Sequence, residues 1–269
     1  MFYTNPADAA IDADALQTLA ESYGQRAAKL PPVALVIAAY NEEGAVGPVV
    51  EALPRTVCGL AAEVIVVADG CADATAKEAD AAGAIVCDVP VNRGQGAALR
   101  LGYRIAREGG AQYIATLDGD GQWDPADLPA MVALLESDEA DFALGSRQLG
   151  QTENTEALLR NMGVRFFARV ISRLTRTHLT DTSSGLRLMR AGLTGTVTQT
   201  QPQYQTSELL IGALLQGYRV AEVPTVMRRR LSGTSKKGHN VLYGLRYASV
   251  IAHTYRRERR AARKRAAAR

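Results

Sequence analysis

Short apolar runs that end in polar residues recur along the first half of the chain. The first is residues 33–40, VALVIAAY, directly after Pro31-Pro32, and the second is residues 63–69, EVIVVAD. A continuous apolar run of this length predicts a strand buried on both faces, as in a parallel sheet covered by helices. Residues 113–118 and 141–147 predict further strands. The chain is therefore expected to fold around a buried, mainly parallel sheet.

Predicted helices separate and follow these strands, so that the two kinds of element alternate along the chain. This alternation predicts an α/β fold with a doubly wound, mainly parallel sheet flanked by helices. The helices are expected at residues 12–30, 47–53, 95–108, 125–137, 156–175, 204–216 and from 240 onward, with a helix–strand pair at 73–89 and a strand at 219–230.

The charge of the chain is divided unevenly between its body and its C-terminus. The 269 residues, 47% of them apolar, can bury a sizeable core, which excludes a disordered chain. The formal net charge is +3, yet residues 256–269 hold eight Lys and Arg against one Glu, a net charge of +7. The rest of the chain therefore carries −4. The sequence thus combines an acidic body with a basic tail.

Cysteine usage and the lengths of the apolar runs predict a cytoplasmic protein. Cys58, Cys71 and Cys87 are odd in number and widely spaced, which predicts reduced thiols and argues against disulfides or structural zinc. The first 20 residues carry three Asp and no apolar core, unlike a signal peptide. No run approaches the roughly 20 apolar residues that span a bilayer. We expect a cytoplasmic chain that is soluble or peripheral on the inner face of the cell membrane.

Carboxylates gather where three of the predicted strands end. The chain reads Tyr40-Asn41-Glu42-Glu43, Asp69-Gly70 and Asp118-Gly119-Asp120 at these ends. Open parallel sheets bind ligands there, although Asp and Asn at any one end also favour turns and helix caps. Glu42 and Glu43 would repel a pyrophosphate where a dinucleotide-binding turn has glycines, and Gly94-Gln95-Gly96 lacks the third glycine. A nicotinamide or P-loop site is therefore disfavoured.

The Asp118-Gly119-Asp120 turn carries the most specific chemistry. Two carboxylates at a strand end can hold Mg²⁺ or Mn²⁺ and leave coordination positions for phosphate oxygens. A calcium loop would need Gly and Glu where this chain has Trp123 and Pro129. An aspartyl-phosphate phosphatase usually has Thr where Gln122 stands. A metal-bridged diphosphate is therefore favoured.

Seven short motifs follow one another along the chain: Ala39–Glu43, Val67–Asp73, Asn92–Ala98, Leu117–Gln122, Gly145–Arg147, Asp181–Arg187 and Arg230–Lys236. In this order they resemble family 2 of the nucleotide-sugar glycosyltransferases, which have the GT-A fold. The resemblance is strongest to the polyprenyl-phosphate, dolichol-phosphate-mannose-synthase-like branch, and it covers residues 33–238. It implies a GT-A domain at 33–237, between the helical segment expected at 1–32 and the amphipathic basic helix expected at 238–269.

The resemblance also implies an activity, a cofactor and residue roles. It implies an inverting transferase that uses Mg²⁺ or Mn²⁺ and moves mannose or glucose from a GDP- or UDP-sugar to a polyprenyl phosphate. The implied metal ligands are Asp118, Asp120 and Gln122. The implied donor-binding residues are Tyr40, Asn41, Glu42, Val67, Asp69, Asp118, Gly119, Arg187, Ser235 and Lys236, and the implied catalytic residues are Asp120, Arg147, Arg230 and Asp181.

Three residues depart from the family pattern. Ala38 stands where Pro is usual, and Ala68 stands where the first Asp of an Asp-Asp-Gly motif is usual. Gln95 replaces a common Lys and so removes a cation near the phosphates. These differences leave the nucleotide and the acceptor open.

The acceptor decides whether the reaction needs a general base. A phosphate monoester, with a second pKa of about 6, is mostly ionised at neutral pH and needs no base, whereas a hydroxyl acceptor does. Asp181 and Glu208 are the carboxylates in motif positions that could be that base. A phosphate acceptor is preferred. A soluble hydroxyl acceptor and a nucleotide-sugar-binding protein without catalysis are the alternatives.

The basic tail at 256–269 continues an apolar helical stripe at 241–255. A basic amphipathic helix fits an anionic membrane surface, where a polyprenyl phosphate would lie. A solvated, charged chain end is the alternative. Nucleic acid is not expected as a partner, because the chain has no recognition motif for it. Trp123, directly after the Asp pair, is expected to pack rather than to stack on a sugar.

Overall fold

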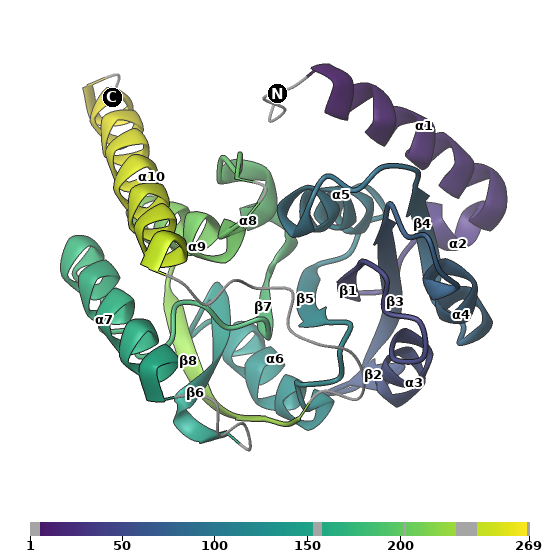
Figure 1. Cartoon of the computed structure of the whole chain (residues 1–269), viewed down its shortest axis with the longest axis horizontal. Coiled ribbons are helices and arrows are strands. Elements are labelled where there is room, and N and C mark those ends of the chain that lie inside the picture. Colours follow the sequence, from purple (N-terminus) through teal and green to yellow (C-terminus); the bar gives the residue numbers. More distant parts are fainter. Residues whose placement is uncertain (1–5, 153–157, 202, 230–240, 268–269) are drawn as a thin grey trace.

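An eight-stranded sheet runs through the centre of the protein (Figure 1). The computed structural model describes residues 6–152, 158–201, 203–229 and 241–267. The strand order is β4-β3-β1-β5-β7-β6-β8, and β2 pairs with the beginning of β3. The strands are β1 Val33–Ala39, β2 Thr56–Val57, β3 Leu60–Asp69, β4 Ile85–Val89, β5 Tyr113–Asp118, β6 Phe142–Thr152, β7 Arg187–Arg190 and β8 Val220–Met227.

One short strand of the main sheet, β7, breaks its parallel pattern. Strands β4, β3, β1 and β5 are parallel, and so are β6 and β8. Strand β7 pairs antiparallel with both β5 and β6 and joins the two parallel groups. The predicted mainly parallel α/β sheet is confirmed. Strand β7 was not predicted, because its four residues, RLMR, are too few and too charged to show a strand pattern.

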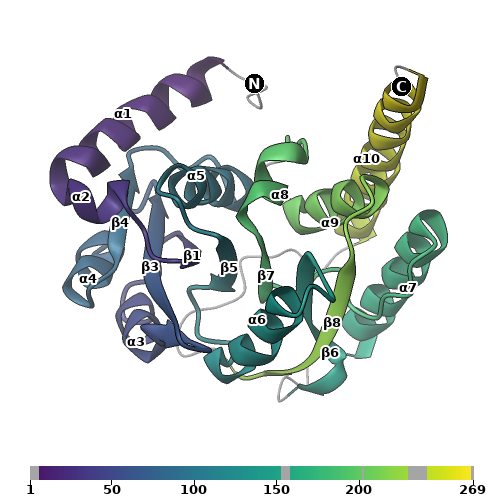
Figure 2. The same cartoon turned by 180° about the vertical axis from the view of Figure 1, so that it is seen from behind.

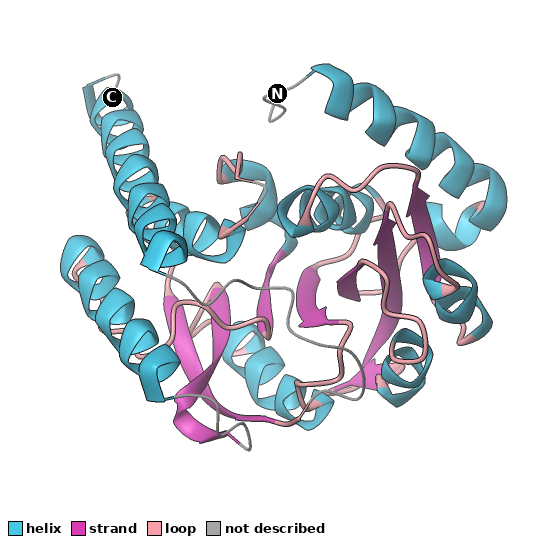
Figure 3. Cartoon of the chain, in the orientation of Figure 1, coloured by secondary structure: helices cyan, strands magenta, loops and turns pink. Residues whose placement is uncertain are grey.

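Helices cover both faces of the sheet (Figures 2 and 3). Helices α1, α5, α8 and α9 contribute buried side chains to the hydrophobic cluster on one face, and α3, α4 and α6 contribute to the cluster on the other. The helices are α1 Pro6–Tyr23, α2 Gln25–Ala28, α3 Val46–Ala52, α4 Thr75–Ala81, α5 Gln95–Glu108, the 3-10 turn η1 Pro125–Asp127, α6 Leu128–Glu136, α7 Leu158–Thr175, α8 Ala191–Thr196, α9 Gln205–Leu215 and α10 Val241–Ala267.

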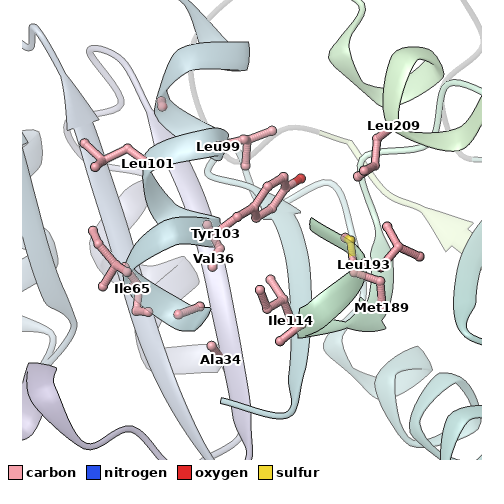
Figure 4. Packing of buried hydrophobic residues seen from close by; sticks show 14 of the residues in the cluster. Ala34, Val36, Ile65, Leu99, Leu101, Tyr103, Ile114, Met189, Leu193 and Leu209 are labelled. Atoms are coloured by element: carbon pink, nitrogen blue, oxygen red, sulfur yellow. The ribbon is translucent and has the colours of Figure 1, made fainter. Parts of the chain in front are cut away.

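The apolar runs form central strands because successive side chains point to opposite, equally buried faces. On β1, Ala34 and Val36 join one cluster, whereas Leu35 and Ile37 join the other. Figure 4 shows the first cluster, where Tyr103 of α5 lies among aliphatic side chains of the neighbouring elements. Each fully buried aliphatic side chain contributes about 1.5–3 kcal/mol, so the sheet is held from both sides.

The two ends of the chain pack onto this core. The predicted N-terminal helix is divided at Gly24, which has a φ of +47°, into α1 and α2. Helix α1 lies against β4, and α10 lies against α9 (Figure 1). Leu19 and Ile251, from these two terminal helices, belong to the same core cluster. The domain boundaries at 32 and 237 stay predictions.

The cysteines and the hydropathy of the helices were also the subject of predictions. Cys58, Cys71 and Cys87 are free thiols, as the spacing predicts. Among the helices of the described ranges, none combines the length and the hydropathy that crossing a bilayer requires.

Candidate active site

The predicted acidic residues lie at one edge of the sheet, where β1, β3 and β5 end. In the strand register, Ala38 on β1 lies opposite Val67 on β3 and opposite Asp118 on β5. Strand β7 runs the other way, so its first residue, Arg187, is near the same edge and pairs with Thr116. The loops that follow three strands and the loop that precedes β7 therefore converge.

Asp69 ends β3 and is held by the loop after β4. Its Oδ2 accepts hydrogen bonds from the backbone N–H groups of Arg93 and Gly94, both at 2.8 Å. Gly70, with φ +70°, permits this approach, since a Cβ there would lie 2.1 Å from the backbone nitrogen of Asn92. Burial raises the pKa of Asp69, and the N–H groups and the charge of Arg93 oppose that rise. The loop thus fixes the orientation of this carboxylate.

The loop after β1 is tied to the loop after β3. Asn41 has a left-handed backbone, with φ of 50°, and its Oδ1 accepts the backbone N–H of Ala72 at 2.9 Å. The backbone N–H of Glu42 donates to Thr75 Oγ1 at 2.8 Å. Tyr40 keeps 40% of its surface exposed. This loop therefore has a fixed shape and leaves the Tyr40 ring accessible to a ligand.

Asp118, at the end of β5, is held from two sides by uncharged donors. Gln95 Nε2 donates to its Oδ1 at 3.1 Å, and Trp123 Nε1 donates to its Oδ2 at 3.0 Å. Gly185 leaves the space for this arrangement, because a Cβ on it would lie 2.3 Å from Asp118 Oδ2. Neither donor carries a positive charge. The carboxylate is therefore oriented without an ion pair to either of them.

The turn after β5 brings further predicted residues to the same place. Asp120 is buried, and its Oδ1 accepts the backbone N–H of Gln122 at 3.1 Å. Gln122 is also buried, and its Nε2 donates to the carbonyl of Arg228 at 3.3 Å, just beyond β8. A Cβ on Gly119 would lie 3.9 Å from Cγ of Glu42, so the first and third acidic loops are in contact.

The oxygen atoms of this turn fit a hard divalent cation. Asp118 and Asp120 offer carboxylates, the ligand type that Mg²⁺ and Mn²⁺ prefer. Within the residues that the structure describes, no cluster of three or more His, Cys, Asp and Glu could enclose an ion by itself. One or two carboxylates, completed by substrate phosphate oxygens and water, are the usual Mg²⁺ ligands. The residues present therefore suit an ion that binds together with a diphosphate.

Arg147 of β6 forms a buried ion pair with Asp181 beside this turn. Arg147 Nε lies 2.6 Å from Asp181 Oδ2, and its Nη2 lies 2.9 Å from Oδ1. The guanidinium carbon is 5.8 Å from the centre of the Trp123 ring, and Trp123 in turn bonds Asp118. Burial alone would raise the pKa of Asp181, but the hydrogen bonds and charge of Arg147 lower it below its usual value.

The sequence of these elements matches a known family. Residues 34–197, more than half of the chain, match the domain described as glycosyl transferase family 2. The chain belongs to this family. Dodecaprenyl-phosphate galacturonate synthase from Rhizobium johnstonii is 30% identical over 214 residues, which cover 77% of this chain and 62% of that protein. Dolichyl-phosphate hexose transferase from Haloferax volcanii is 31% identical over 207 residues, which cover 75% and 85%.

A solved structure has the same fold. Glucosyl-3-phosphoglycerate synthase from Mycobacterium tuberculosis, in complex with Mn²⁺, UDP and glucosyl-3-phosphoglycerate, aligns with a TM-score of 0.64 at 18% identity, over 88% of this chain and 83% of that one. The predicted GT-A fold is confirmed by this likeness, and the prediction of a glycosyltransferase is confirmed by the family.

The two candidate bases of this glycosyltransferase are both engaged by arginine. Asp181 is bound by Arg147, as described above. Glu208, fully buried on α9, accepts the backbone N–H of Thr200 at 2.7 Å and is 2.8 Å from Nη1 of Arg257 on α10. Glu208 thus joins α9 to α10 through a buried ion pair.

Two predicted donor-binding residues lie in the interior. The side chain of Val67 is fully buried in the core, 3.4 Å from the place of a Cβ on Gly102. Arg187 is 1% exposed, and its Nη1 donates to Gln205 Oε1 at 3.2 Å. Burial raises the pKa of the adjacent Tyr103, and the charge of Arg187 opposes that rise. The structure therefore gives both residues internal partners, and their donor-binding roles stay predictions.

Three other predicted residues, Arg230, Ser235 and Lys236, lie outside the described residues. Trp123 is buried, as predicted, but it also bonds Asp118, which its apolar character did not indicate. The roles of Gly185 and of Gln95 as supports of Asp118 were also missed. No local pattern marks them, because they lie 67 and 23 residues from Asp118 in the sequence.

Proposed function

We propose that this chain is an inverting hexosyltransferase that moves mannose or glucose from a GDP- or UDP-sugar to a polyprenyl phosphate. The bond between the anomeric carbon and the nucleoside diphosphate breaks, and an acceptor phosphate oxygen forms the new bond on the opposite face. Mg²⁺ or Mn²⁺, held by Asp118 and Asp120 with Gln122 beside them, would offset the charge on the donor diphosphate.

Donor binding is assigned to the three acidic loops. Tyr40 and Glu42 lie on the loop after β1, and Asp69 ends β3, where carboxylates can accept hydrogen bonds from a ribose and a base. Arg147 lies beside the Asp118 turn, and the charge of Asp118 is among the causes that raise its pKa. Its permanent positive charge can therefore stabilise the leaving diphosphate.

We base the choice of acceptor on the ion pairs that the two candidate bases form. A hydroxyl acceptor needs a carboxylate that can take its proton, yet Asp181 is in a bidentate ion pair and Glu208 is buried in another. The lowered pKa of Asp181 makes it a weak base. An acceptor that is already ionised needs neither residue. A phosphate monoester, with a second pKa of about 6, meets this requirement.

Two helices support a lipid-bound acceptor. Met162 and Phe166, one turn apart on α7, are 67% and 59% exposed. On α10, Arg257 is turned inward to Glu208, so it does not belong to the exposed basic face. From residue 256 onward, the exposed cations among the described side chains are Arg256, Arg259, Arg260, Arg263 and Lys264. Exposed apolar and basic side chains together suit an anionic membrane surface, so we place the enzyme peripherally on the inner face of the cell membrane.

A lipid-extraction assay tests the function. The full chain is incubated with radiolabelled GDP-mannose or UDP-glucose, undecaprenyl phosphate in detergent, and Mn²⁺. We expect label in the organic phase, release of the nucleoside diphosphate, and loss of both after chelation. Label that appears only on water-soluble acceptors would replace this proposal with the hydroxyl-acceptor alternative. Nucleotide binding without release from any acceptor would indicate a binding protein.

Asp120→Ala should abolish transfer in that assay, because it removes one of the two carboxylates of the turn. Asp124→Asn is the matched control in the same loop, since Asp124 caps the η1 turn and pairs with Arg228. The control should retain transfer even if its melting temperature falls. Full activity of Asp120→Ala would overturn the metal assignment.

Membrane contact is tested by removing the exposed cations of α10 from residue 256 onward. Replacing Arg256, Arg259, Arg260, Arg263 and Lys264 with Gln, while keeping Arg257, should reduce binding to vesicles that contain phosphatidylglycerol. Each lost charge costs about 1 kcal/mol near an anionic surface. Binding of UDP or GDP should stay unchanged. Equal vesicle binding by the variant would show that these residues are only solvated.

A further inference from the structure

We propose that Asp12, on the N-terminal helix α1, is a positioning residue for the donor site, because it bonds Arg93 and keeps that guanidinium from forming a hydrogen bond with Asp69. The inference rests on the proposed assignment of Asp69 to the donor nucleotide. Helix α1 precedes residues 34–197, the part of the chain that matches the family domain. An element outside that domain would thus help to shape its binding site.

A single arginine lies between two buried carboxylates. Arg93 Nη1 is 2.6 Å from Asp12 Oδ1 and donates also to the carbonyl of Asp8, at 3.3 Å. On its other side, Arg93 Nε is 3.6 Å from Asp69 Oδ1, which is beyond hydrogen-bond distance. The three side chains are between 3% and 7% exposed. The guanidinium is therefore bonded to α1 and only near Asp69.

The two carboxylate oxygens of Asp69 differ in their hydrogen bonds. Oδ2 is occupied by the backbone N–H groups of Arg93 and Gly94. Oδ1 is buried and has no hydrogen bond among the described residues. A buried carboxylate oxygen left in this state costs free energy, which a ligand N–H or O–H group would recover. Oδ1, which faces Nε of Arg93 at 3.6 Å without a hydrogen bond, is therefore the oxygen that a nucleoside donor could engage.

Asp12 keeps that oxygen available. Without the charge of Asp12, the buried guanidinium would keep the carboxylate of Asp69 as an anionic neighbour, only 3.6 Å away. Arg–carboxylate pairs in low dielectric are strongly attractive, and Arg favours bidentate contact. Arg93 would then move onto Oδ1 and compete with the nucleoside. The backbone N–H of Arg93, which orients Oδ2, would move with it.

Helix α1 also contacts the rest of the protein at other residues. The effect of Asp12 on the donor site can therefore be tested separately from the packing of the helix. Ala15 and Leu19 lie in the core, and Tyr23 Oη donates to Asp80 Oδ1 at 2.6 Å, at the far end of the helix. Asp12 falls on the same helical face as Ala15 and Leu19, three and seven residues later. A carboxylate within an apolar stripe is the sequence signal that could have revealed it.

The test is calorimetric titration of UDP and GDP, each with Mn²⁺, into the full chain. Asp12→Asn, which is close to isosteric, should weaken nucleotide binding about tenfold, since one buried hydrogen bond to a charged group is lost. In the transfer assay its KM for the donor should rise while kcat changes little. Tyr23→Phe, which loosens α1 elsewhere, should lower the melting temperature without weakening binding.

A double variant separates competition from structure. Asp12→Asn with Arg93→Met removes the competing guanidinium and leaves Asp69 with the backbone N–H donors of residues 93 and 94, so it should bind more tightly than Asp12→Asn alone. Wild-type affinity in a folded Asp12→Asn, or a double variant that binds no better than Asp12→Asn, would overturn the inference. If the wild type binds neither nucleotide, the proposed donor site itself is wrong.

Discussion

The sheet edge joins two halves of the molecule in which buried carboxylates have different partners. In the half built on β1, β3 and β5, uncharged groups donate the hydrogen bonds to Asp69 and Asp118. In the half built on β6, β7 and β8, arginines bind Asp181 and Glu208 directly. N–H groups thus orient Asp69 and Asp118, whereas arginines neutralise Asp181 and Glu208.

This difference has a chemical consequence. A carboxylate that is oriented by N–H groups keeps its negative charge, which a cation or a nucleoside can use. A carboxylate in an ion pair with arginine supports the fold but has little charge left to offer. Arg93, beside Asp69, is the exception in the first half, and while it is bonded to Asp12 on α1 its Nε stays 3.6 Å from Asp69 Oδ1, beyond hydrogen-bond distance.

The largest effect is expected from a substitution that disrupts the hydrogen bond between Trp123 and Asp118. Gly185→Ala would place a Cβ 2.3 Å from Asp118 Oδ2 and 2.6 Å from Trp123 Nε1, so the carboxylate must move. A displacement of this order costs about 100-fold in turnover, which the transfer assay would measure. The control is Gly192→Ala on α8, where a Cβ meets nothing within 4 Å. Equal activity of the two variants would contradict the support assigned to Trp123 and Asp118.

The next effect concerns stability in the other half. Asp181→Asn leaves Arg147 buried without its counter-ion and should cost about 3–5 kcal/mol in the free energy of unfolding, measured with urea. Glu108→Gln, which breaks an exposed pair with Arg104 on α5, should cost at most about 0.5 kcal/mol. A small loss for Asp181→Asn would mean that the ion pair does not stabilise this half.

The same pair has a defined pH dependence. The folded pKa of Asp181 lies below its usual value, which is about 3.9 in an unfolded chain. Its contribution is therefore complete above pH 4 and is lost as the pH falls through the folded pKa. The difference in stability between the wild type and Asp181→Asn should shrink below about pH 4. A constant difference down to lower pH would show that the charge of Asp181 is not its cause.

A smaller effect is expected when the uncharged donor beside Asp118 is replaced by a cation, as beside Asp181. Gln95→Lys puts a cation beside Asp118 and should raise the Mn²⁺ concentration for half-maximal activity about tenfold, because an adjacent charge shifts a carboxylate by a pK unit or more. Gln95→Glu, the acidic counterpart of similar size, should shift that concentration downward. A shift in the same direction for both would indicate that geometry, rather than charge, decides.

The sequence by itself determined the strands, most helices and the place of the acidic residues. Continuous apolar runs can be satisfied only by burial on both faces, and parallel strands bring their carboxyl ends to one edge. The loops with Glu42, Asp69 and Asp118 were therefore predictable from local pattern. Strand β7 was not, because four residues with two arginines resemble a loop until their neighbours are known.

Only the tertiary structure decided which charges are paired. Arg147 and Asp181 are 34 residues apart, Arg257 and Glu208 are 49 apart, and Arg93 and Asp12 are 81 apart. In the sequence, an arginine that lies buried against a carboxylate looks the same as one in solvent. The cost of burying an unpaired charge forces such partners together, but it acts through the packed fold and leaves no local pattern. The sequence therefore located the carboxylates, and the fold selected those that pair with arginine.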